Sequence, residues 1–362
     1  MQNQTKPKPA AKARPKGVPF EIGDTIVAPG TSETVDLPLS LLSTHTPVTL
    51  TVRVVNGKRA GPTLFVSAAV HGDEINGVEI IRRVLASKSL KNLRGTLIAA
   101  PIVNVFGFIS RDRYLPDRRD LNRSFPGSSA GSLAGQLAKL FMSEIVAKSD
   151  AGIDLHTGSM FRQNLPQIRG MCEDPKLLEL AMAFGAPVVM NAGLRDGSMR
   201  KSAGDIGVPV LVYEAGEALR FDELSIQLGV KGVLNTMRHL GMLSASRKRE
   251  MKPSVHAESS FWERAPVGGI MRTMCALGNK IAEGGVLGVV ADPLGNVEVE
   301  VLAREEGILI GCSNLPVVNQ GDALFHVARV RNPARAVETV EIIQDASDLS
   351  EFDTVAPLEG QN

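Results

Sequence analysis

The sequence has 362 residues, which fits one large domain together with a smaller one. Hydrophobic residues make up 43% of the chain, and 40 basic against 39 acidic residues leave a formal net charge of +1. This balance provides no overall positive field for nucleic acid or an anionic membrane. No apolar run reaches the ~20 residues that a membrane-spanning helix needs. Three widely spaced cysteines, Cys172, Cys275 and Cys312, fit no CxxC pattern and indicate free thiols in a reducing, cytoplasmic compartment.

The N-terminal segment, residues 1–18, is basic and rich in proline and has no acidic residue. It lacks the apolar core of a secretory signal, so its composition predicts a disordered basic tail. Two roles remain open for this tail: a solvated extension, and a contact with an acidic partner.

The region that follows, residues 20–57, has β-type patterns separated by turn residues. Its last apolar run, residues 48–55, ends at Asn56-Gly57, which is a strong tight-turn signal. We therefore expect this run to pair as a hairpin with the next one, residues 63–70.

The run at residues 63–70 is followed by two side chains that can bind a metal, His71 and Glu74. Apolar residues at near-helical spacing over residues 75–86 predict a helix that begins beside Glu74. A histidine and a carboxylate three positions apart, across a strand-to-helix turn, can face the same ion. Zinc accepts nitrogen and oxygen ligands, and catalytic zinc sites keep one position open for water. Taken alone, the two residues also fit an ordinary surface turn.

A third candidate ligand, His156, ends another apolar stretch beside a glycine. Strand, helix and strand in alternation, with a further strand at residues 95–104, favour an α/β sheet with helices on both faces. Functional groups gather at the carboxyl ends of the strands in such sheets. His71, Glu74 and His156 would form a two-histidine, one-carboxylate set, which suits a hydrolytic zinc site better than a structural one. Asp154 is left with two roles, orienting a ligand or an arginine, and capping a turn.

An arginine-rich segment lies between these strands, with five arginines in the eighteen residues 110–127. Its Pro, Asp and Gly content and its lack of period indicate a loop. A solvated charged loop fits this composition. A loop that binds an anion and polarises a carbonyl fits it equally well, because arginine offers a bidentate fork for a carboxylate.

A second carboxylate, Glu214, follows the buried run at residues 208–213. An acid at the end of an apolar strand, in a sheet whose other strands end in metal ligands, is a candidate general base. Residues 159–169, which include Arg169, are expected to be a polar loop. Helices are expected over residues 132–148, 175–185 and 221–242.

The C-terminal part contains strands and glycine turns, and residues 277–290 resemble residues 316–327. Such an echo resembles the duplicated β-sandwich of lipoyl and biotinyl carrier domains. The hairpin that carries the modified lysine in those domains contains none here, at residues 292–296, which excludes a carrier role. His326 in this part is expected to be structural.

The expected organisation has five parts. They are a disordered basic tail at residues 1–18, an α/β domain with the candidate zinc hydrolase site and an N-terminal β extension at 19–243, a linker at 244–260, an all-β barrel-sandwich domain at 261–335 and a C-terminal tail at 336–362.

Five ordered motifs resemble those of the succinylglutamate desuccinylase/aspartoacylase family, a branch of the zinc carboxypeptidase superfamily. The motifs are His71-Gly72-Asp73-Glu74, Arg113-Tyr114-Leu115-Pro116, Asp120-Leu121-Asn122-Arg123, Asp154-Leu155-His156 and Glu214. The resemblance covers roughly residues 60–335. It implies a mixed sheet flanked by helices, as in zinc carboxypeptidases, with the smaller β domain behind it.

The resemblance also implies a role for individual residues. One Zn²⁺ per chain would be bound by His71, Glu74 and His156. Glu214 would be the general base and later the acid, and Arg113 would polarise the scissile carbonyl. The substrate's carboxylate would be held by Asn122 and Arg123.

The acyl pocket is where this chain departs from the family pattern. Arg169 and Arg200 are the candidates there for an acidic acyl group, and a surface position fits either arginine equally well. We expect a small-molecule substrate, an acylated amino acid or short peptide, with no nucleic acid or membrane partner; a homo-oligomer stays open. The main hypothesis is a zinc hydrolase that cleaves an N-acyl amide bond. A carboxypeptidase-like peptidase and a non-catalytic metal-binding interaction protein are the alternatives.

Overall fold

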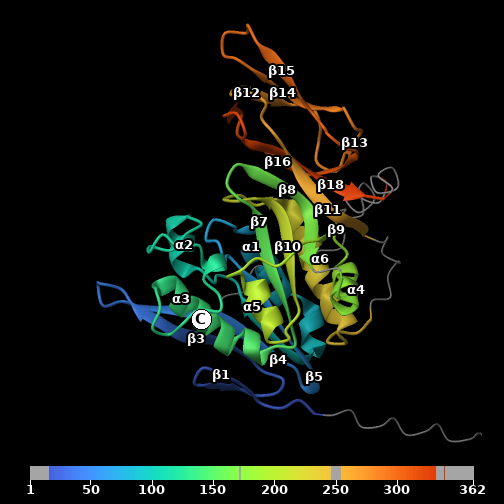
Figure 1. The fold of residues 1–362 in the computed structure, drawn as a ribbon. Helices are drawn as coiled ribbons and strands as arrows, with labels where there is room; N and C mark the ends of the chain where they lie inside the picture. The colour runs from blue at the N-terminus through green and yellow to red at the C-terminus, as the bar shows by residue number, and fades with distance from the viewer. Residues whose placement is uncertain (1–15, 171–172, 246–253, 332–337, 339–362) are drawn as a thin grey trace, which may run out of the picture.

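The computed structural model of the chain describes residues 16–170, 173–245, 254–331 and 338 (Figure 1). Most of the predicted N- and C-terminal tails, Cys172 and residues 246–253 of the predicted linker lie outside these ranges. Among the residues that are described, no helix is both long and apolar enough to cross a membrane.

A mixed twelve-stranded sheet runs through the molecule and confirms the α/β prediction. Its strands, in spatial order, are β13 (Lys280–Ile281), β16 (Gly307–Ser313), β18 (Ala323–Val330), β11 (Val255–Arg264), β9 (Val188–Asn191), β8 (Arg162–Gly170), β10 (Val210–Glu217), β7 (Ala151–Gly158), β5 (Arg59–Ala68), β6 (Arg94–Ala100), β4 (Pro47–Asn56) and β3 (Ser32–Leu41). A separate hairpin joins β1 (Phe20–Ile22) to β2 (Thr25–Val27).

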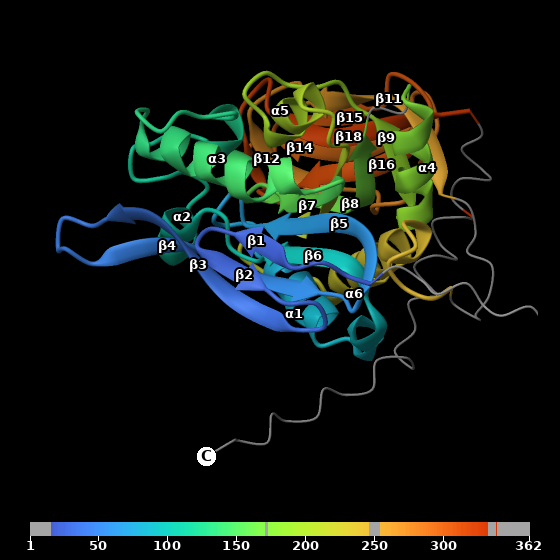
Figure 2. The same ribbon diagram turned by 90° about the horizontal axis from the view of Figure 1, so that it is seen from below.

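Helices cover both faces of this sheet, as Figure 2 shows. They are α1 (Asn76–Leu85), α2 (Val105–Ser110), α3 (Leu133–Glu144), α4 (Pro175–Phe184), α5 (Met199–Asp205) and α6 (Glu223–His239). The apolar residues of α1, α4 and α6 form one core with the inner strands. Those of α3 and α5 form a second core on the opposite face, together with the β1–β2 hairpin. Each of these five helices buries apolar residues, because a sheet with two hydrophobic faces needs a cover on both.

The strands that carry the candidate site residues are neighbours. β5 pairs in parallel with β7, and β7 pairs in parallel with β10. Because the carboxyl ends of parallel strands meet at one edge of a sheet, the segments after β5, β7 and β10 converge there.

Two predictions from the sequence are wrong. The strand β4 does not form a hairpin with β5; it pairs with β3 and β6, and β6 lies between them. Gly57 instead allows a close approach to the start of β6, since its N–H donates to the Gly95 carbonyl at 2.8 Å and a Cβ there would lie 2.3 Å from the Leu93 oxygen.

The expected polar loop at residues 159–169 is largely a strand, β8, which pairs with β10, β9 and β16. The polar residues of this segment predict a loop, but in the structure the side chains of Asn164 and Gln167 are buried and form hydrogen bonds with neighbouring strands. Gln167 is fully buried, and its amide donates to the carbonyl of Ile310 on β16 at 3.3 Å.

The C-terminal strands continue the long sheet through β11, β16, β18 and β13. Four more strands form a second sheet: β15 (Glu298–Leu302), β14 (Val286–Ala291), β12 (Gly269–Thr273) and β17 (Val317–Val318). An apolar cluster that includes Phe261, Leu287 and Phe325 joins the two sheets. We call residues 255–330 the C-terminal module. Its first strand, β11, begins inside the range expected to be a linker.

Candidate active site

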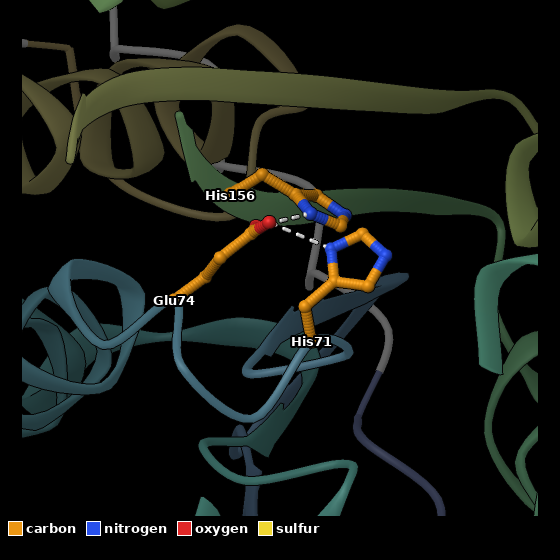
Figure 3. A group of neighbouring side chains, drawn as sticks. All are labelled: His71, Glu74 and His156. Carbon is orange, nitrogen blue, oxygen red and sulfur yellow. Dashed lines mark hydrogen bonds and ion pairs between the residues drawn. The ribbon is translucent and has the colours of Figure 1, made fainter. Parts of the chain in front are cut away.

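Three buried side chains meet at the carboxyl edge of the sheet (Figure 3). The Nδ1 atom of His71 lies 2.7 Å from Glu74 Oε1, and the Nδ1 atom of His156 lies 2.7 Å from Glu74 Oε2. One ligand atom from each of the three residues lies within 4.8 Å of the others. The structure therefore brings together all three residues that the sequence proposes as metal ligands.

The turn that carries two of these residues is shaped by its neighbours. The N–H of Glu74 donates to the His71 carbonyl at 3.1 Å, which closes the turn after β5. Gly72 packs against the backbone of α2, where a Cβ would lie 2.0 Å from the Gly107 carbonyl carbon. Only glycine fits this contact. Asn104 holds α2 in position, since its side-chain oxygen accepts the Gly107 N–H at 2.9 Å.

Each histidine ring is held from behind by a further carboxylate. The Nε2 atom of His156 lies 2.6 Å from Asp154 Oδ2, and the Nε2 atom of His71 lies 3.2 Å from Asp120 Oδ1. Asp154 is itself fixed by the Ser67 hydroxyl, which donates to its Oδ1 at 2.8 Å. Carboxylates in this position orient metal-binding imidazoles and raise their basicity. Of the two roles left open for Asp154, the contacts favour orientation of His156.

The charges in this cluster shift one another's pKa values. Burial acts to lower the pKa of His156, but Asp154 and Glu74 outweigh burial and raise that pKa well above its ordinary value. Burial likewise acts to raise the pKa of Glu74, yet the two histidines hold it well below its usual range. Glu74 is therefore ionised at neutral pH, as a metal ligand has to be.

The arginine-rich segment is part of the site. The Nη1 atom of Arg113 lies 3.1 Å from Glu74 Oε1, and its Nη2 atom lies 3.1 Å from Asp120 Oδ2. Asn122 accepts the Met199 N–H at 2.9 Å and so ties the segment to α5. Arg123 is exposed, and its guanidinium donates to the Asn122 carbonyl at 2.6 Å.

Glu214 lies beside the three-residue cluster. Its residue on β10 is directly opposite His156 on β7, so both side chains leave the same face of the sheet. The Asn164 amide donates to Glu214 Oε2 at 3.1 Å, and Arg169 Nη1 lies 3.9 Å from Glu214 Oε1. The candidate base therefore has an amide and a guanidinium beside it. Arg200 is engaged elsewhere, with the carbonyls of residues 192 and 193.

Sequence reasoning assigned no role to three residues at this site, Asp120, Asn164 and Glu217. Asp120 contacts both His71 and Arg113, and its place in the motif before Asn122 was the available signal. Asn164 and Glu217 gave no signal, because their partners lie on strands distant in the sequence.

The residues present fit a zinc ion. Two imidazole nitrogens and one carboxylate, all from buried side chains, form a donor set that zinc prefers at catalytic sites. Three protein ligands are the number at which catalytic zinc keeps its fourth position for water or substrate. The two Nδ1 atoms face the shared Glu74, whereas the two Nε2 atoms are held by carboxylates, which is the arrangement seen around metal-bound histidines.

Such a cluster at the carboxyl ends of parallel strands, with a further acid on the adjacent strand, is typical of metal-dependent hydrolases. The profile of the succinylglutamate desuccinylase/aspartoacylase catalytic domain matches residues 60–240. The chain therefore belongs to this family.

Individual relatives agree with this assignment. The N-alpha-acetyl-L-2,4-diaminobutyric acid deacetylase of Halomonas elongata is 27% identical over 283 residues, which are 75% of this chain and 83% of that one. A crystal structure of a succinylglutamate desuccinylase/aspartoacylase from Rhodobacter sphaeroides is 26% identical, with a TM-score of 0.73 over 83% of this chain and 96% of that one. A succinylglutamate desuccinylase from a Silicibacter species is also 26% identical, with a TM-score of 0.74 over 88% of this chain and 100% of that one.

Proposed function

We propose that the protein is a zinc-dependent hydrolase that cleaves the amide bond of an N-acyl amino acid or a similar small carboxylate-bearing molecule. The observation that carries this proposal is the convergence of His71, Glu74 and His156 within 4.8 Å, beside Glu214 on the next strand. The Halomonas elongata relative, named as a deacetylase of an acylated diamino acid, supports a small acylated substrate.

The zinc would be held by His71, Glu74 and His156, one ion per chain. Zinc, when bound, supplies a Lewis acid and lowers the pKa of water from 15.7 toward ~7. Glu214 would take a proton from the attacking water and later give it to the leaving amine nitrogen. Arg113 would donate to the substrate's carbonyl oxygen, where negative charge develops during the reaction.

The remaining arginines would hold the two ends of the substrate. Asn122 and Arg123 would bind the carboxylate of the amino-acid part. Arg169, on the other side of Glu214, would contact the acyl group. Its guanidinium is only part-exposed and is too far from Glu214, at 3.9 Å, for a close hydrogen bond, which leaves capacity for a ligand.

The fold-level expectations are also proposals. We infer that the sheet follows the zinc carboxypeptidase arrangement over residues 19–243, and that the C-terminal module has the barrel-sandwich fold. The two sheets that share one apolar cluster support the second inference. The turn between β14 and β15 has no lysine, so a carrier function is not part of the proposal.

The test is a screen of the purified, zinc-loaded protein against N-acyl amino acids and unmodified dipeptides, with release of free amine as the readout. We expect an N-acyl amino acid to be cleaved. Cleavage of dipeptides alone would favour the carboxypeptidase alternative. No cleavage of either class, by a protein that retains zinc, would favour a metal-binding interaction protein and contradict the proposal.

A further inference from the structure

Strand β10 carries a second carboxylate, Glu217, three residues after Glu214. A register shift lies between them, because Glu214 is opposite His156 on β7 whereas Glu217 is opposite Gly158. Three steps on β10 thus span two steps on β7. This bulge directs both carboxylates to the same face of the sheet, whereas a regular strand would direct them to opposite faces.

Glu217 is almost fully buried, with 5% of its surface exposed. Its Oε1 accepts the backbone N–H of Phe161 at 3.1 Å, and its Oε2 accepts the side-chain amide of Asn314 at 2.8 Å. The N–H of Asn314 in turn donates to the Phe161 carbonyl at 2.7 Å. Arg220 lies at 3.5 Å from Oε2. Both carboxylate oxygens are therefore engaged, so Glu217 is suited to hold segments together rather than to exchange protons.

These bonds join three segments that are far apart in the sequence. They are the end of β10, the turn between β7 and β8, and the end of β16 in the C-terminal module. The strand β16 also runs beside the candidate base, because its Gly311 is opposite Asn164, whose amide donates to Glu214. The module therefore borders both carboxylates of β10.

The backbone at this junction is strained. Phe161 and Leu219 have φ values of +65° and +59°, which side chains of this size rarely adopt. Leu219 donates its N–H to the carbonyl of Asp73, the neighbour of the metal-ligand candidate Glu74, at 2.8 Å. Strained conformations persist only where surrounding contacts over-determine them, and they concentrate at functional sites.

We propose that Glu217 is a positioning residue: by locking the β7–β8 turn and Asn314 of the C-terminal module to β10, it fixes the position of Glu214 for catalysis. The module is then part of the catalytic unit rather than an attached domain. The inference rests on the proposed function, because Glu214 is the base in that reaction.

The kinetic test compares Glu217→Ala with a matched control, Glu263→Ala. Glu263 is also buried in the module, at 8% exposure, and it accepts the backbone N–H of Arg304 at 2.8 Å, away from β10. Because small displacements of a catalytic group cost up to about 100-fold in rate, we expect Glu217→Ala to lower kcat by about 10- to 100-fold, with KM changed less than about threefold and zinc content unchanged.

The control should keep kcat within about twofold of the wild type. Glu217→Gln should recover most of the lost kcat. The oxygen of the new amide can accept the Phe161 N–H, and its NH₂ group can donate to the Asn314 side-chain oxygen once the Asn314 amide has flipped. An equal fall in kcat in the Glu217→Ala and Glu263→Ala variants would overturn the proposal. A rise in KM with kcat unchanged would also overturn it. Asn314→Ala removes one of the two bonds and should give an intermediate loss of kcat; unaltered kcat in this variant would also overturn it.

Amide hydrogen exchange on the zinc-loaded chain provides a readout that is independent of activity. In Glu217→Ala, the amides of Phe161 and Asn314 should exchange at least about tenfold faster, and in Glu263→Ala only that of Arg304 should do so. If the wild type had no amidase activity and the two variants still showed this exchange pattern, the proposed function would be rejected and the junction would stand. Unchanged exchange at Phe161 and Asn314 would reject the junction itself.

Discussion

The two sides of the candidate active site differ in how far their polar atoms are satisfied. On the side of His71, Glu74 and His156, every ring nitrogen and both oxygens of Glu74 have partners within the protein, and the exception beside them is Asp73 Oδ1, which is buried without a hydrogen bond from any described residue. On the side of Glu214, Arg169 Nε and His326 Nδ1 are buried, and neither makes a hydrogen bond within the described part of the chain. His71, Glu74 and His156 come from the α/β part of the chain, whereas His326 comes from the C-terminal module.

This difference separates two tasks. Carboxylates behind the histidines fix the ring orientations in advance, as a metal centre requires. Buried polar atoms without partners are costly, and they persist where a ligand completes them. We therefore expect the first side to determine metal binding, and the second side to determine catalysis and the choice of acyl group.

The largest effect is expected from Glu214→Gln, which removes the base and keeps the shape of the side chain. General-base catalysis contributes typically about 10²–10⁴-fold, so turnover should fall by that factor. Zinc content, measured by elemental analysis, should stay at the wild-type level. Loss of zinc together with activity would mean that Glu214 is itself a zinc ligand, and the division of the site into a metal-binding side and a catalytic side would be wrong.

On the metal side, Asp154→Asn should weaken zinc binding by about 10–100-fold, because it replaces the carboxylate that holds His156. The measurement is a competitive zinc titration with a chelating dye. Asp150→Asn is the matched control. Asp150 precedes the same strand at its opposite end and accepts the Thr63 N–H at 2.7 Å. Equal zinc affinity in the wild type and the Asp154 variant would show that the His156 ring needs no such support.

Substrate binding on the arginine-rich segment is tested by Arg123→Ala. Losing one charge-assisted bond to a substrate carboxylate costs about 1.5 kcal/mol, so KM should rise roughly tenfold while kcat changes little. Arg119→Ala, from the same segment and more than half exposed, should leave KM unchanged. An unaltered KM in the Arg123 variant would remove the carboxylate clamp from the proposed function.

The last expected effect is on stability rather than on activity, and it concerns the pH dependence of unfolding. Burial, with Arg169 and Arg162 nearby, lowers the pKa of His326 to about 3. Below the ordinary histidine pKa of ~6.5 the unfolded chain therefore takes up a proton that the folded chain does not, and stability falls as the pH is lowered. Between pH 6.5 and pH 5 this linkage amounts to about 2 kcal/mol at most.

The matched variant is His326→Phe, which keeps a flat ring against Trp262, stacked at 4.5 Å from the histidine. Urea unfolding at pH 7 and pH 5 should show a smaller loss of stability in this variant than in the wild type. An identical loss of stability in the two proteins between pH 7 and pH 5 would mean that His326 does not stay neutral in the folded state.

The convergence of His71, Glu74 and His156 is predicted from the sequence because its signals are local. His71 and Glu74 lie across one strand-to-helix turn, and His156 and Asp154 share one strand, so hydrophobic runs and glycines are enough to locate them. Glu214 is located in the same way, at the end of a buried run, and the family resemblance added a role for Arg113 through a short motif.

The other side is poorly predicted because it depends on pairing between distant strands. The strand β8 looks like a polar loop, since Asn164 and Gln167 are polar and Pro166 weakens the strand pattern. The side-chain amides of Asn164 and Gln167 donate to β10 and β16, and no local pattern reveals those partners. The misplaced β4–β5 hairpin has the same origin, because β6 enters between two strands that are adjacent in the sequence.

The central claim is that two imidazoles and one acid hold a single ion, and zinc stoichiometry tests it most directly. After dialysis against zinc and removal of the excess, the wild type should retain ~1 zinc per chain, and His71→Ala and His156→Ala should retain almost none while remaining folded. A folded His156→Ala variant that still holds the wild-type amount of zinc would contradict the account.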